Sequence, residues 1–373
     1  MKRIVIIVSS LRRSGPIVVV QNLLRNIDRN KFDVQIVKLM EDEPSRSITS
    51  EFINDGFIVH ELHSTKLKIE LFPHGILKQL RKLLNVIKPD LIHTHGYQAC
   101  LLGAKLADEY KVVETLHCIA KEDFISSKGH ILGRYMLYRY FNCLKKICGA
   151  AAISDTVKKY YELKLKNIKV RLVYNGVAIA TQLPSKDIIR EKLKISISDK
   201  VFLVIASLSK RKDPLLIIRS FKKAFPLNDH SVKLLFLGKG NLHDVCLSEI
   251  GVDNRIKLLG WQPNVSDYLA ASDYTISASH SEGFGLNFIE SVTAGVPVIG
   301  TDIPPFMEFY NIFRELQPLN FKVGNETELS EVLRKAVRMD IEMSEYSSIA
   351  KELFSAKTMA KNYENFYNDL IEN

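Results

Sequence analysis

Short apolar runs alternate along the chain with longer segments in which apolar residues recur with the period of a helix. The short runs of the first half have the length and the β-branched content of buried parallel strands. They are Ile4–Val8, Val34–Leu39, Leu91–His93, Val112–Leu116 and Gly149–Ile153. Helices are predicted between them, for example over Ile17–Ile27 and Ile76–Ile87.

The same alternation restarts in the second half of the chain. Strands are predicted over Val201–Ile205, Lys233–Leu237, Ile256–Leu259, Tyr274–Ser277 and Pro297–Gly300. Helices are predicted over Pro214–Ala224 and Val265–Ala271. Alternating strands and helices predict parallel sheets with helices on both faces. Two such rounds in 373 residues predict an α/β protein with two doubly wound, Rossmann-like domains.

The seam between the two rounds is expected at the turn signal Asn175–Gly176, which precedes the looser segment Ala178–Lys186. We therefore expect an N-terminal domain over residues 1–177 and a second domain over residues 178–355. Ligands of open α/β sheets bind at the carboxyl ends of the strands. Two such domains that face each other across a cleft would bind their substrates in that cleft.

Composition indicates a globular protein of a reducing compartment. Apolar residues make up 46% and charged residues 25% of the chain, as in ordinary globular domains. The five cysteines are odd in number and form no close metal-type pair, so no disulfide framework is expected. The opening run Lys2–Val8 is too short for a signal peptide, and no stretch is long enough to span a bilayer. A cytoplasmic location is expected.

The formal net charge of +10 leaves several partners open. Phosphates of a small ligand, nucleic acid or an anionic membrane surface would each suit a basic protein, and so would a solvated basic surface without a partner. None of the recognition motifs of nucleic-acid-binding proteins is present. Nucleic acid is therefore not expected as a partner.

The most informative motif is Ser281–Glu290, which follows the predicted strand Tyr274–Ser277. Its two glycines remove Cβ atoms where a backbone approaches a ligand closely. A helix is predicted from about Leu286 to Ala294, and free N–H groups at its start would form an anion site. A surface turn with two unrelated glutamates is the alternative interpretation.

Beyond this motif the chain resembles a known family. Glu282 and Glu290, followed by Ala294–Ile299, resemble the signature of retaining glycosyltransferases of the GT-B fold, family 4. Leu234–Gly240 is similar to the family's strand-and-glycine turn, and Val173–Val177 to its interdomain junction. Ala152–Ser154 also resembles the strand that ends the family's first domain, so the resemblance spans nearly the whole chain.

The resemblance implies what each domain does. The first domain would bind the acceptor and the second the nucleotide-sugar donor, while a C-terminal helix over residues 356–373 would cross back to the first domain. The reaction would be transfer of a sugar with retention at the anomeric carbon, with neither a metal nor another cofactor. The acceptor would be a glycan or a lipid-linked glycan, and surface polysaccharide biosynthesis is the expected context.

Site residues follow from the same resemblance. Glu290 matches the glutamate that binds the donor ribose, and Glu282 the one near the donor sugar and its reacting centre. Lys212 matches the lysine that pairs with the diphosphate, where a fixed cation stabilises the departing charge. Backbone groups that would face the sugar and diphosphate belong to Gly283, Phe284, Gly285, Leu286 and Asn287.

The chain departs from the family at two points of the predicted donor site. Ser207 stands five residues before Lys212, where the family usually has an arginine. Serine offers one neutral hydroxyl in place of a bidentate guanidinium, so Lys210 or Arg211 would have to compensate. The first strand-to-helix loop, Ser9–Pro16, also retains only Gly15 of a turn that is usually richer in glycine and lies under the donor phosphate.

Histidines form a further candidate group at the carboxyl ends of two predicted strands. His117 resembles the family's active-site histidine beside the donor sugar, where a neutral imidazole hydrogen-bonds hydroxyl groups. His95 and Gly96 would line the acceptor side, and His93 would be structural. A zinc site made of these histidines is the alternative, although no carboxylate or cysteine has metal-site spacing to them.

Basic and aromatic residues are interleaved over Lys128–Lys146. Such a segment suits an anionic membrane interface, or it is a helix that buries one aromatic face. We hypothesise that it docks the enzyme, together with the helix Leu77–Ile87, at the inner face of a membrane that holds a lipid-linked acceptor. Two other functions stay open: a catalytically degenerate relative that binds a nucleotide sugar or a glycan, and a GT-B nucleotide-sugar epimerase.

Overall fold

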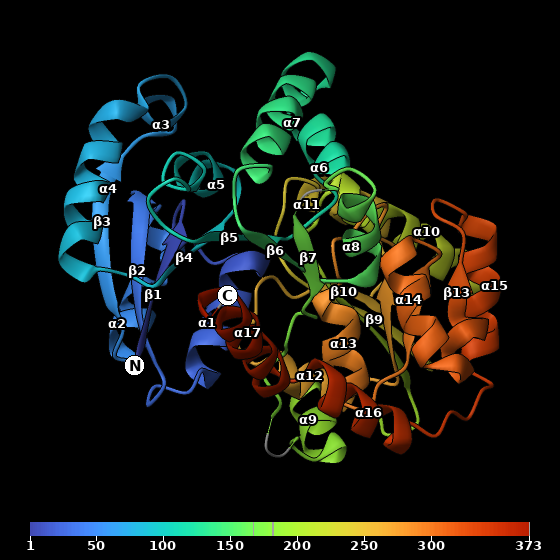
Figure 1. The fold of residues 1–373 in the computed structure, drawn as a ribbon. Coiled ribbons are helices and arrows are strands. Elements are labelled where there is room, and N and C mark those ends of the chain that lie inside the picture. Colours follow the sequence, from blue (N-terminus) through green and yellow to red (C-terminus); the bar gives the residue numbers. More distant parts are fainter. Residues whose placement is uncertain (167, 181–182, 373) are drawn as a thin grey trace. The chain divides into compact units, whose positions relative to one another are not determined.

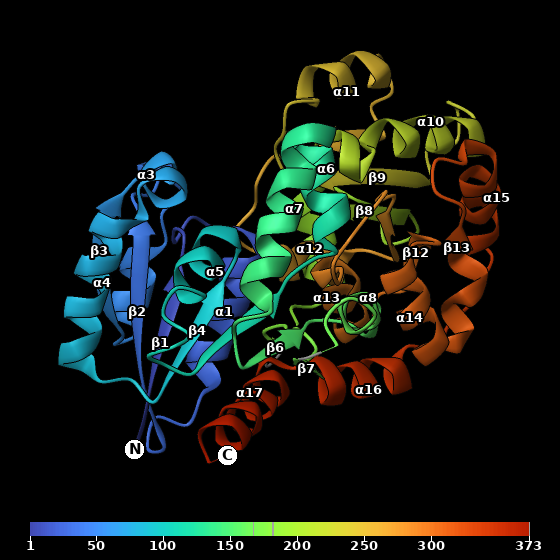
Figure 2. The ribbon, with the colours of Figure 1, turned by 45° about the horizontal axis from the view of Figure 1, so that its top comes forward.

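The computed structural model describes residues 1–166, 168–180 and 183–372, and their contacts divide into two compact units (Figure 1). One unit comprises residues 1–178 and 354–373, and the other comprises residues 179–353. Each unit contains one sheet with helices around it, as the second view also shows (Figure 2). Thr181 and Gln182, in the loose segment expected after the seam, lie outside the described residues.

The first unit is built on a seven-stranded parallel sheet in the order β3-β2-β1-β4-β5-β6-β7. The central strand β1 is apolar because helices cover both of its faces, and Ile4–Val8 are at most 1% exposed. The strand bounds are β1 (Lys2–Val8), β2 (Phe32–Met40), β3 (Ile58–Ser64), β4 (Leu91–His95), β5 (Val112–Leu116), β6 (Gly149–Ala152) and β7 (Lys169–Leu172).

Helices of the first unit come from both ends of the chain. Helix α17 packs beside α1. Its Tyr363 and Tyr367 hydrogen-bond Thr115 of β5 and His93 of β4, respectively, on one face of the sheet. α5 and α7 cover the opposite face of the same strands. The helix bounds are α1 (Gly15–Asn26), α2 (Thr49–Asn54), α3 (Lys66–Leu71), α4 (Pro73–Ile87), α5 (Tyr97–Gly103), α6 (Ala120–Lys128), α7 (His130–Leu144), α8 (Asp155–Glu162) and α17 (Ala356–Ile371).

After the second unit, the chain returns to the first unit at residue 354 and passes beside the predicted turn Asn175–Gly176. Val177 N–H donates to the Phe354 carbonyl, and Ala356 N–H donates to the Val177 carbonyl. A Cβ atom on Gly176 would lie 2.6 Å from the Cα of Ala356 and from the Ser355 carbonyl oxygen. Glycine is therefore required at this position because two backbone segments touch there.

The second unit is built on a six-stranded parallel sheet in the order β10-β9-β8-β11-β12-β13. Its strands are β8 (Lys200–Ile205), β9 (Val232–Leu237), β10 (Ile256–Leu258), β11 (Tyr274–Ser277), β12 (Val298–Thr301) and β13 (Asn320–Phe321). Its helices are α9 (Lys186–Leu193), α10 (Pro214–Ala224), α11 (His243–Ile250), α12 (Val265–Ala271), α13 (Leu286–Thr293), α14 (Pro304–Ile312), α15 (Glu326–Ala336) and α16 (Ser344–Phe354), the last residue of which belongs to the first unit.

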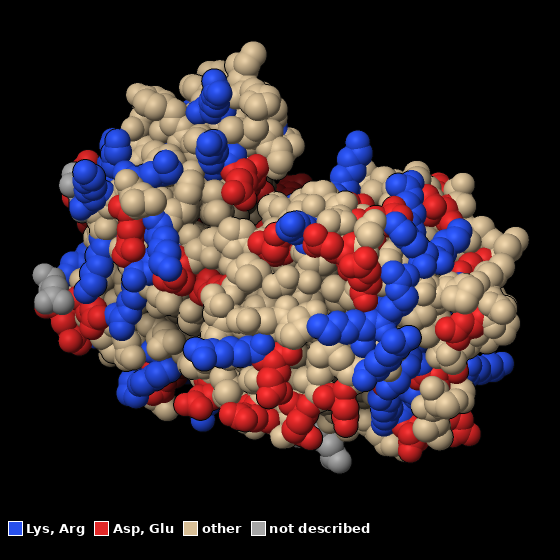
Figure 3. Space-filling view, turned by 90° about the vertical axis from the view of Figure 1, so that its right-hand side faces the viewer, with Lys and Arg blue, Asp and Glu red and all other residues tan. Residues whose placement is uncertain are grey.

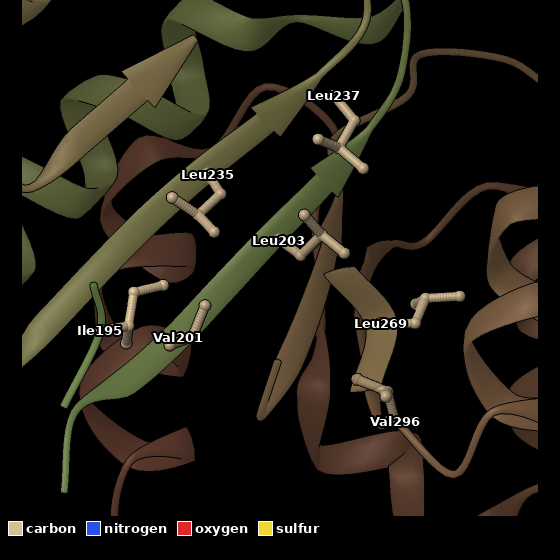
Figure 4. Packing of buried hydrophobic residues seen from close by; sticks show 7 residues of the cluster. All are labelled: Ile195, Val201, Leu203, Leu235, Leu237, Leu269 and Val296. Atoms are coloured by element: carbon tan, nitrogen blue, oxygen red, sulfur yellow. The ribbon is translucent and has the colours of Figure 1, made fainter. Parts of the chain in front are cut away.

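Both faces of this second sheet are packed. On one face Val201 and Leu203 of β8 lie beside Leu235 and Leu237 of β9, under side chains from the helical layer such as Leu269 (Figure 4). On the other face Phe202 packs against the rings of Phe221 in α10, edge-on, and of Phe225, which follows that helix. Successive side chains of a strand point to opposite faces, so the near-continuous apolar run of β8 serves two cores.

The sequence predicted the fold class correctly. The strands β5 and β11 and the helices α10 and α12 have the predicted bounds. Other ends differ: β4 runs on to His95 rather than ending at His93, and α4 begins at Pro73 rather than Ile76. Three strands at or near sheet edges were missed: β3, β7 and β13. No helix in the described part of the chain is long and apolar enough to cross a membrane.

Candidate active site

Four neighbouring strands of the second unit end at one edge of its sheet, and their loops carry most of the predicted donor-site residues. Ser207 and Lys212 follow β8, while Glu282 and the start of α13 follow β11, which is paired with β8. The glycine turn 238–240 follows β9, on the other side of β8. Because all strands are parallel, these loops lie together at the edge where ligands of α/β sheets bind.

The turn after β9 packs backbone to backbone against the loop after β8. A Cβ atom on Gly238 would lie 1.9 Å from the Ala206 carbonyl oxygen, and one on Gly240 would lie 2.2 Å from that of Leu208. Leu208 N–H donates to the Lys239 carbonyl at 3.2 Å. The glycines therefore serve the contact between two loops of the protein itself, and this contact fixes the path of the chain that leads to Lys212.

Lys212 and Glu282 form an ion pair within the second unit. The ammonium group contacts Glu282 Oε1, and the two side chains are 14% and 10% exposed. Arg211 Nη1 lies 3.0 Å from Glu282 Oε2, and Ser279 Oγ donates to Glu282 Oε1 at 2.8 Å. Burial would raise the pKa of Glu282, but the charges of Lys212 and Arg211 and these hydrogen bonds outweigh it and hold the pKa below its ordinary value.

Further hydrogen bonds join the two loops that carry this pair. His280 N–H donates to the Arg211 carbonyl at 2.8 Å, and Arg211 Nη1 donates to the Ser281 carbonyl at 2.8 Å. The His280 ring lies 2.8 Å from Asp213 Oδ2, while Asp213 Oδ1 caps α10 by accepting from Leu216 N–H. Asp213 has a φ of 43°, in the left-handed region. The loops after β8 and β11 therefore behave as one structural element.

The helix α13 starts where the sequence predicted, at Leu286, and its first turn has no side-chain cap. Its N-cap Gly285 has a φ of 102°, and a Cβ atom there would lie 2.4 Å from the Phe306 ring. Glycine is thus required by internal packing, and not only by the approach of a ligand as the sequence suggested. Because the helix starts without a cap, the amides of Leu286 and Asn287 remain available to an anion.

Side chains of the same motif have structural roles. Phe284 is 2% exposed and packs edge-on against Phe309, so it can offer a ligand only backbone groups. Asn287 Nδ2 donates to the Ile205 carbonyl at 3.4 Å and to Ser277 Oγ at 3.3 Å. The side chain of Asn287 thereby ties the start of α13 to the ends of β8 and β11.

Glu290 lies one turn inside α13 and is half-buried. Its carboxylate has no hydrogen-bond or ion-pair partner among the described residues, and burial raises its pKa. A half-buried acceptor without a protein partner is suited to hydroxyl groups of a ligand.

Ser207, on the loop after β8, carries no charge at the position where the family usually has an arginine. Ser207 is exposed, and its hydroxyl lies 3.1 Å from that of Ser209. Arg211 is committed to Glu282, whereas Lys210 is exposed and has no ion-pair partner among the residues that the structure describes. Of the two residues expected to compensate, Lys210 therefore keeps its charge unengaged.

A residue that the sequence analysis missed lies at the same edge. Trp261, the single tryptophan of the chain, follows β10 and is 56% exposed. Gly238 N–H donates to the carbonyl of the preceding residue, Gly260, at 2.7 Å, so this loop adjoins the glycine turn after β9. The rule that ligands bind at the carboxyl ends of strands, applied to the strand predicted over Ile256–Leu259, would have found it.

In the first unit, two of the predicted histidines are hydrogen-bonded to each other. His95 Nδ1 lies 2.9 Å from His117 Nε2, at the carboxyl ends of the adjacent strands β4 and β5. Burial lowers the pKa of His117 to about 4, and burial together with the neighbouring His93 and His117 holds the pKa of His95 well below its ordinary value. His95 Nε2 is buried without a partner among the described residues. Both rings are therefore neutral at physiological pH.

His93 belongs to a separate network under the sheet. Its Nδ1 lies 2.7 Å from the Tyr367 hydroxyl and its Nε2 lies 2.7 Å from Thr115 Oγ1. Tyr363 completes this network with a 2.8 Å bond to Thr115. Among the described residues, no group of three or more histidine, cysteine, aspartate or glutamate side chains is arranged to hold a metal ion, so nothing supports the zinc alternative.

Gly15 begins α1 at the carboxyl end of β1 and is exposed. The loop before it is shaped by a segment that the sequence analysis did not single out. Leu11 N–H donates to Asp42 Oδ1 at 2.7 Å, and Arg13 N–H donates to the Arg46 carbonyl at 2.8 Å. The guanidinium of Arg13 pairs with Glu51, whereas Arg12 has no ion-pair partner in the described part of the chain.

The basic, aromatic segment forms α6 and α7, and its aromatic residues divide between two faces. Gly133, Met136, Tyr140 and Leu144 form the buried face of α7. The outward face carries exposed large side chains, namely Ile131, Leu132, Tyr135 and Tyr138. α4, the other helix of the docking hypothesis, buries most of its apolar residues but exposes Val86, so its part of the hypothesis stays a prediction.

An exposed apolar surface also occurs on α3. Leu67, Leu71 and the adjoining Phe72 are 64%, 58% and 69% exposed. Arg139 of α7 donates to the Glu70 carbonyl at 3.3 Å, and α5 contacts both helices, so α3 and α7 adjoin at one end of the first unit (Figure 1 and Figure 2). We call the outward sides of α3 and α7 the α3–α7 surface.

Charge is distributed differently on the rest of the molecule. Lysine and arginine side chains are interspersed with aspartate and glutamate over the face seen in Figure 3. On that face the basic side chains form no continuous track. This face therefore suits a solvated surface better than a binding surface for nucleic acid.

Comparisons with known proteins agree with this geometry. The family model "Glycosyltransferase Family 4" matches residues 13–181, and "Glycosyl transferases group 1" matches residues 185–353. The O-antigen biosynthesis glycosyltransferase WclY of Escherichia coli is 26% identical, over 99% of both chains. UDP-Gal:alpha-D-GlcNAc-diphosphoundecaprenol alpha-1,3-galactosyltransferase of Escherichia coli is 29% identical, over 61% of each chain. Anabaena Alr3699/HepE in complex with UDP-glucose has the same fold, with a TM-score of 0.80 at 17% identity over 99% of this chain and 100% of that one.

Proposed function

The chain belongs to glycosyltransferase family 4 and has the GT-B fold, and from this premise we propose that it transfers a sugar from a nucleoside-diphosphate sugar to a lipid-linked glycan, with retention at the anomeric carbon. The observation that carries the proposal is the Lys212–Glu282 pair beside the uncapped start of α13. It places a cation, a carboxylate and free amides at one edge of one sheet, as transfer from a diphosphate donor requires.

We propose that the second unit binds the donor. The amides of Leu286 and Asn287 and the ammonium group of Lys212 would hold the diphosphate, and Glu290 would accept hydrogen bonds from the ribose. Trp261 is placed at the same edge to stack on the nucleobase, since an exposed indole offers a flat apolar face.

The pairing of Lys212 with Glu282 suggests an order of events. When phosphate oxygens arrive, they compete with Glu282 for the ammonium group, which is thereby drawn to the leaving diphosphate. Glu282 keeps Arg211 and Ser279 as partners and becomes available to a sugar hydroxyl. The charge that develops on the diphosphate is stabilised by Lys212 and the helix amides, so the proposal requires no metal or other cofactor.

The first unit would bind the acceptor. His95 and His117 lie at the carboxyl ends of β4 and β5 and are neutral, and their mutual hydrogen bond leaves one nitrogen of each ring for hydroxyl groups, an N–H donor on one ring and an acceptor on the other. Gly96, which begins the next turn, has a φ of 89° and no Cβ atom to obstruct a ligand. Gly15 and the loop before it would also face the substrates, at the carboxyl end of β1.

We further propose that the α3–α7 surface rests on an anionic membrane at the inner face of the cytoplasmic membrane. Apolar side chains such as Phe72 and Ile131 are exposed there beside the basic residues Lys66, Lys68 and Arg134. Basic and aromatic residues together suit the interface of an anionic bilayer. One relative is named for a diphosphoundecaprenol acceptor, which resides in a membrane. Biosynthesis of O-antigen or another surface polysaccharide is the proposed pathway, and the similarity to the O-antigen biosynthesis glycosyltransferase WclY supports it.

The test is transfer onto a defined acceptor. The protein is incubated with UDP-glucose, UDP-galactose, UDP-N-acetylglucosamine or GDP-mannose and with GlcNAc-diphosphoundecaprenol. Released nucleoside diphosphate and the lengthened lipid are measured, and the anomeric configuration of the product is read by NMR. An inverted product would refute retention. Binding of nucleotide without release or transfer would favour the degenerate relative, and a converted donor sugar without an acceptor product would favour the epimerase.

A further inference from the structure

Glu114 is a glutamate in the middle of an apolar strand, and it plays no part in the proposed chemistry. It lies in β5 and is 0% exposed. No cation pairs with it among the described residues. The titratable groups that interact with it electrostatically are thiols and phenols, namely Cys100 of α5, Tyr140 and Cys143 of α7, Tyr161 of α8 and, from the opposite face of the sheet, Tyr363 of α17. Burial raises the pKa of each of them, so all are uncharged at neutral pH.

The hydrogen bonds of Glu114 indicate where its proton lies. Oε1 accepts from the amide of Gly96 and from the hydroxyl of Tyr140, both at 3.1 Å. Oε2 contacts Thr94 Oγ1, which also lies 2.9 Å from the carbonyl oxygen of Val113. A threonine hydroxyl carries one hydrogen, and a carbonyl oxygen only accepts. If Thr94 donates to Val113, the hydrogen between Thr94 and Glu114 must belong to the carboxyl group.

The same conclusion follows from the cost of burying charge. An ionised carboxylate inside a protein without a cation is strongly disfavoured, and such a group takes up a proton instead. Burial raises the pKa of Glu114 to about 8, against the opposing effect of its bonds from Thr94, Tyr140 and Gly96. At neutral pH every hydrogen-bonding group of the cluster is then satisfied.

We propose that Glu114 is held as a neutral carboxylic acid and that, in this form, it is a positioning residue for the acceptor-side histidines. Gly96 directly follows His95 and has a φ of 89°. It is the N-cap residue of α5 and has no side chain that could cap the helix. The bond from Gly96 N–H to Glu114 holds the turn that carries His95. His95 in turn holds His117 through their 2.9 Å bond.

The cluster lies on the face of the sheet opposite to His93. Thr94 and Glu114 point to the side of α5 and α7, whereas His93 and Thr115 point to α17. Gly103 of α5 allows that helix to approach Thr94, because a Cβ atom there would lie 2.8 Å from Thr94 Cγ2. The turn at Gly96 is thus anchored from the face of the sheet that α5 and α7 cover, and Glu114, which is 0% exposed, acts through His95 and not on the substrate.

Ionisation of Glu114 would remove one bond and add a buried charge. The bond from the carboxyl group to Thr94 needs the proton, and an anion would pull the Gly96 turn and the Tyr140 hydroxyl closer. Acceptor turnover should therefore fall as the pH rises through the pKa of Glu114. This part of the inference rests on the proposed function, because it assumes that His95 and His117 serve an acceptor.

The matched variants are Glu114→Gln and Glu114→Leu. Glutamine reproduces the neutral acid: its amide donates to Thr94 while its oxygen accepts from Gly96 and Tyr140. We expect Glu114→Gln to keep wild-type turnover at pH 7 and to lose the alkaline fall in turnover. Glu114→Leu leaves the Gly96 amide without its acceptor and should lower kcat/KM for GlcNAc-diphosphoundecaprenol by on the order of 10²-fold with unchanged UDP binding.

Two measurements decide the protonation without any turnover. Infrared spectra at pH 7 should show the carbonyl stretch of a protonated carboxylic acid in the wild type that is missing in Glu114→Gln. Urea unfolding should show that Glu114→Gln gains stability over the wild type as the pH rises from 5 to 8. Absence of the infrared band would overturn the neutral acid, even if the protein proved not to be a transferase.

The kinetic measurements decide the positioning role. A Glu114→Gln enzyme with the wild-type alkaline fall, or a folded Glu114→Leu enzyme with wild-type acceptor kinetics, would overturn it. Failure of the proposed function itself would be recognised differently: the wild type would then transfer no sugar with any donor of the panel.

Discussion

Lys212 and Glu282 are paired at the edge of the second sheet, with side chains that are only 14% and 10% exposed. Exposed ion pairs contribute little to stability, but this pair is largely shielded and is held by Arg211 and Ser279 as well. It keeps the carboxylate ionised and the ammonium group in place before any ligand arrives. Folding therefore already brings the two groups together, so that donor binding does not have to order them.

Replacement of Lys212 by alanine is expected to abolish most of the transfer activity. Removal of a preorganised charge that stabilises a leaving group costs on the order of 10²–10³ in kcat. Donor KM should change less, because the helix amides and Glu290 still bind the nucleotide. The measurement is steady-state release of nucleoside diphosphate.

Lys335→Ala is the matched control, since Lys335 is an exposed lysine of α15 in the same unit. It should keep wild-type kinetics. Equal losses in the two variants would mean that Lys212 acts only through general charge.

Glu290→Gln tests the ribose contact. A hydrogen bond to a charged acceptor contributes about 1.5–3 kcal/mol, so loss of the charge should weaken nucleotide binding by roughly tenfold or more. Binding of UDP or GDP can be followed through the fluorescence of Trp261, because no other tryptophan contributes to the signal.

Glu331→Ala, in an exposed position of α15, should bind as the wild type does. If Glu290→Gln binds UDP and GDP with unchanged affinity, the ribose is not held by Glu290. If neither nucleotide changes the fluorescence of the wild type, Trp261 does not contact the base.

Gly285→Ala is expected to destabilise the second unit. The Cβ atom would lie 2.4 Å from the Phe306 ring and would sit on a residue with a φ of 102°. Overpacking and a left-handed non-glycine residue together cost about 2–4 kcal/mol. Gly295→Ala is the control, since its φ is 76° but its Cβ would meet no atom within 4 Å, which leaves only about 1 kcal/mol of backbone strain. Urea unfolding compares the two, and equal losses would contradict the packing argument.

Acid should destabilise the first unit through its buried histidines. Burial lowers the pKa of His117 to about 4 and that of His93 to about 3, against about 6.5 in the unfolded chain. The unfolded state then binds protons that the folded state does not, so stability is present above about pH 6.5 and is lost as the pH falls toward 4. Glu114 acts in the opposite direction in an overlapping range, because its raised pKa makes stability fall as the pH rises from about 4.5 to about 8.

The histidine contribution is therefore best measured in a Glu114→Gln background. His117→Asn in that background should flatten the dependence of urea unfolding on pH between 6.5 and 4. An unchanged slope would mean that His117 is protonated in the folded protein.

Membrane binding should depend on the α3–α7 surface. Replacement of Tyr135 and Tyr138 with serine should reduce flotation with vesicles of anionic phospholipid, because these side chains are 54% and 67% exposed on the outward face of α7. Val252→Ser, on the second unit and 90% exposed, should not change flotation. Flotation that is the same with neutral and anionic vesicles, or the same in all variants, would refute this surface as the docking site.

The apolar pattern predicted most of the sheet correctly because the central strands are buried on both faces, as in Ile4–Val8. The missed strands have physical reasons. β3 (Ile58–Ser64) and β7 (Lys169–Leu172) are edge strands, and polar side chains break their apolar runs. β13 (Asn320–Phe321) has two residues, too few for any pattern. Tertiary pairing, and not local sequence, makes these segments strands.

Less of the candidate site than of the fold could be predicted from the sequence. The family resemblance singled out Lys212 and Glu282, yet it did not indicate that they pair with each other, and about seventy residues separate them. Glu114 was visible as a lone acid inside the strand predicted over Val112–Leu116, and that anomaly was the available signal. Its partners come from β4, α5 and α7, so only the folded structure could identify them.

The position of α17 has a consequence for synthesis on the ribosome. Most strands of the first unit are translated before the second unit, whereas Tyr363 and Tyr367, which hydrogen-bond His93 and Thr115 beneath those strands, are translated after it. The second unit has all of its residues before that point. The second unit can therefore fold before α17, which completes the first unit, has been translated. A ribosome that stalls before residue 356 would leave the strands of the first unit exposed to proteases and chaperones.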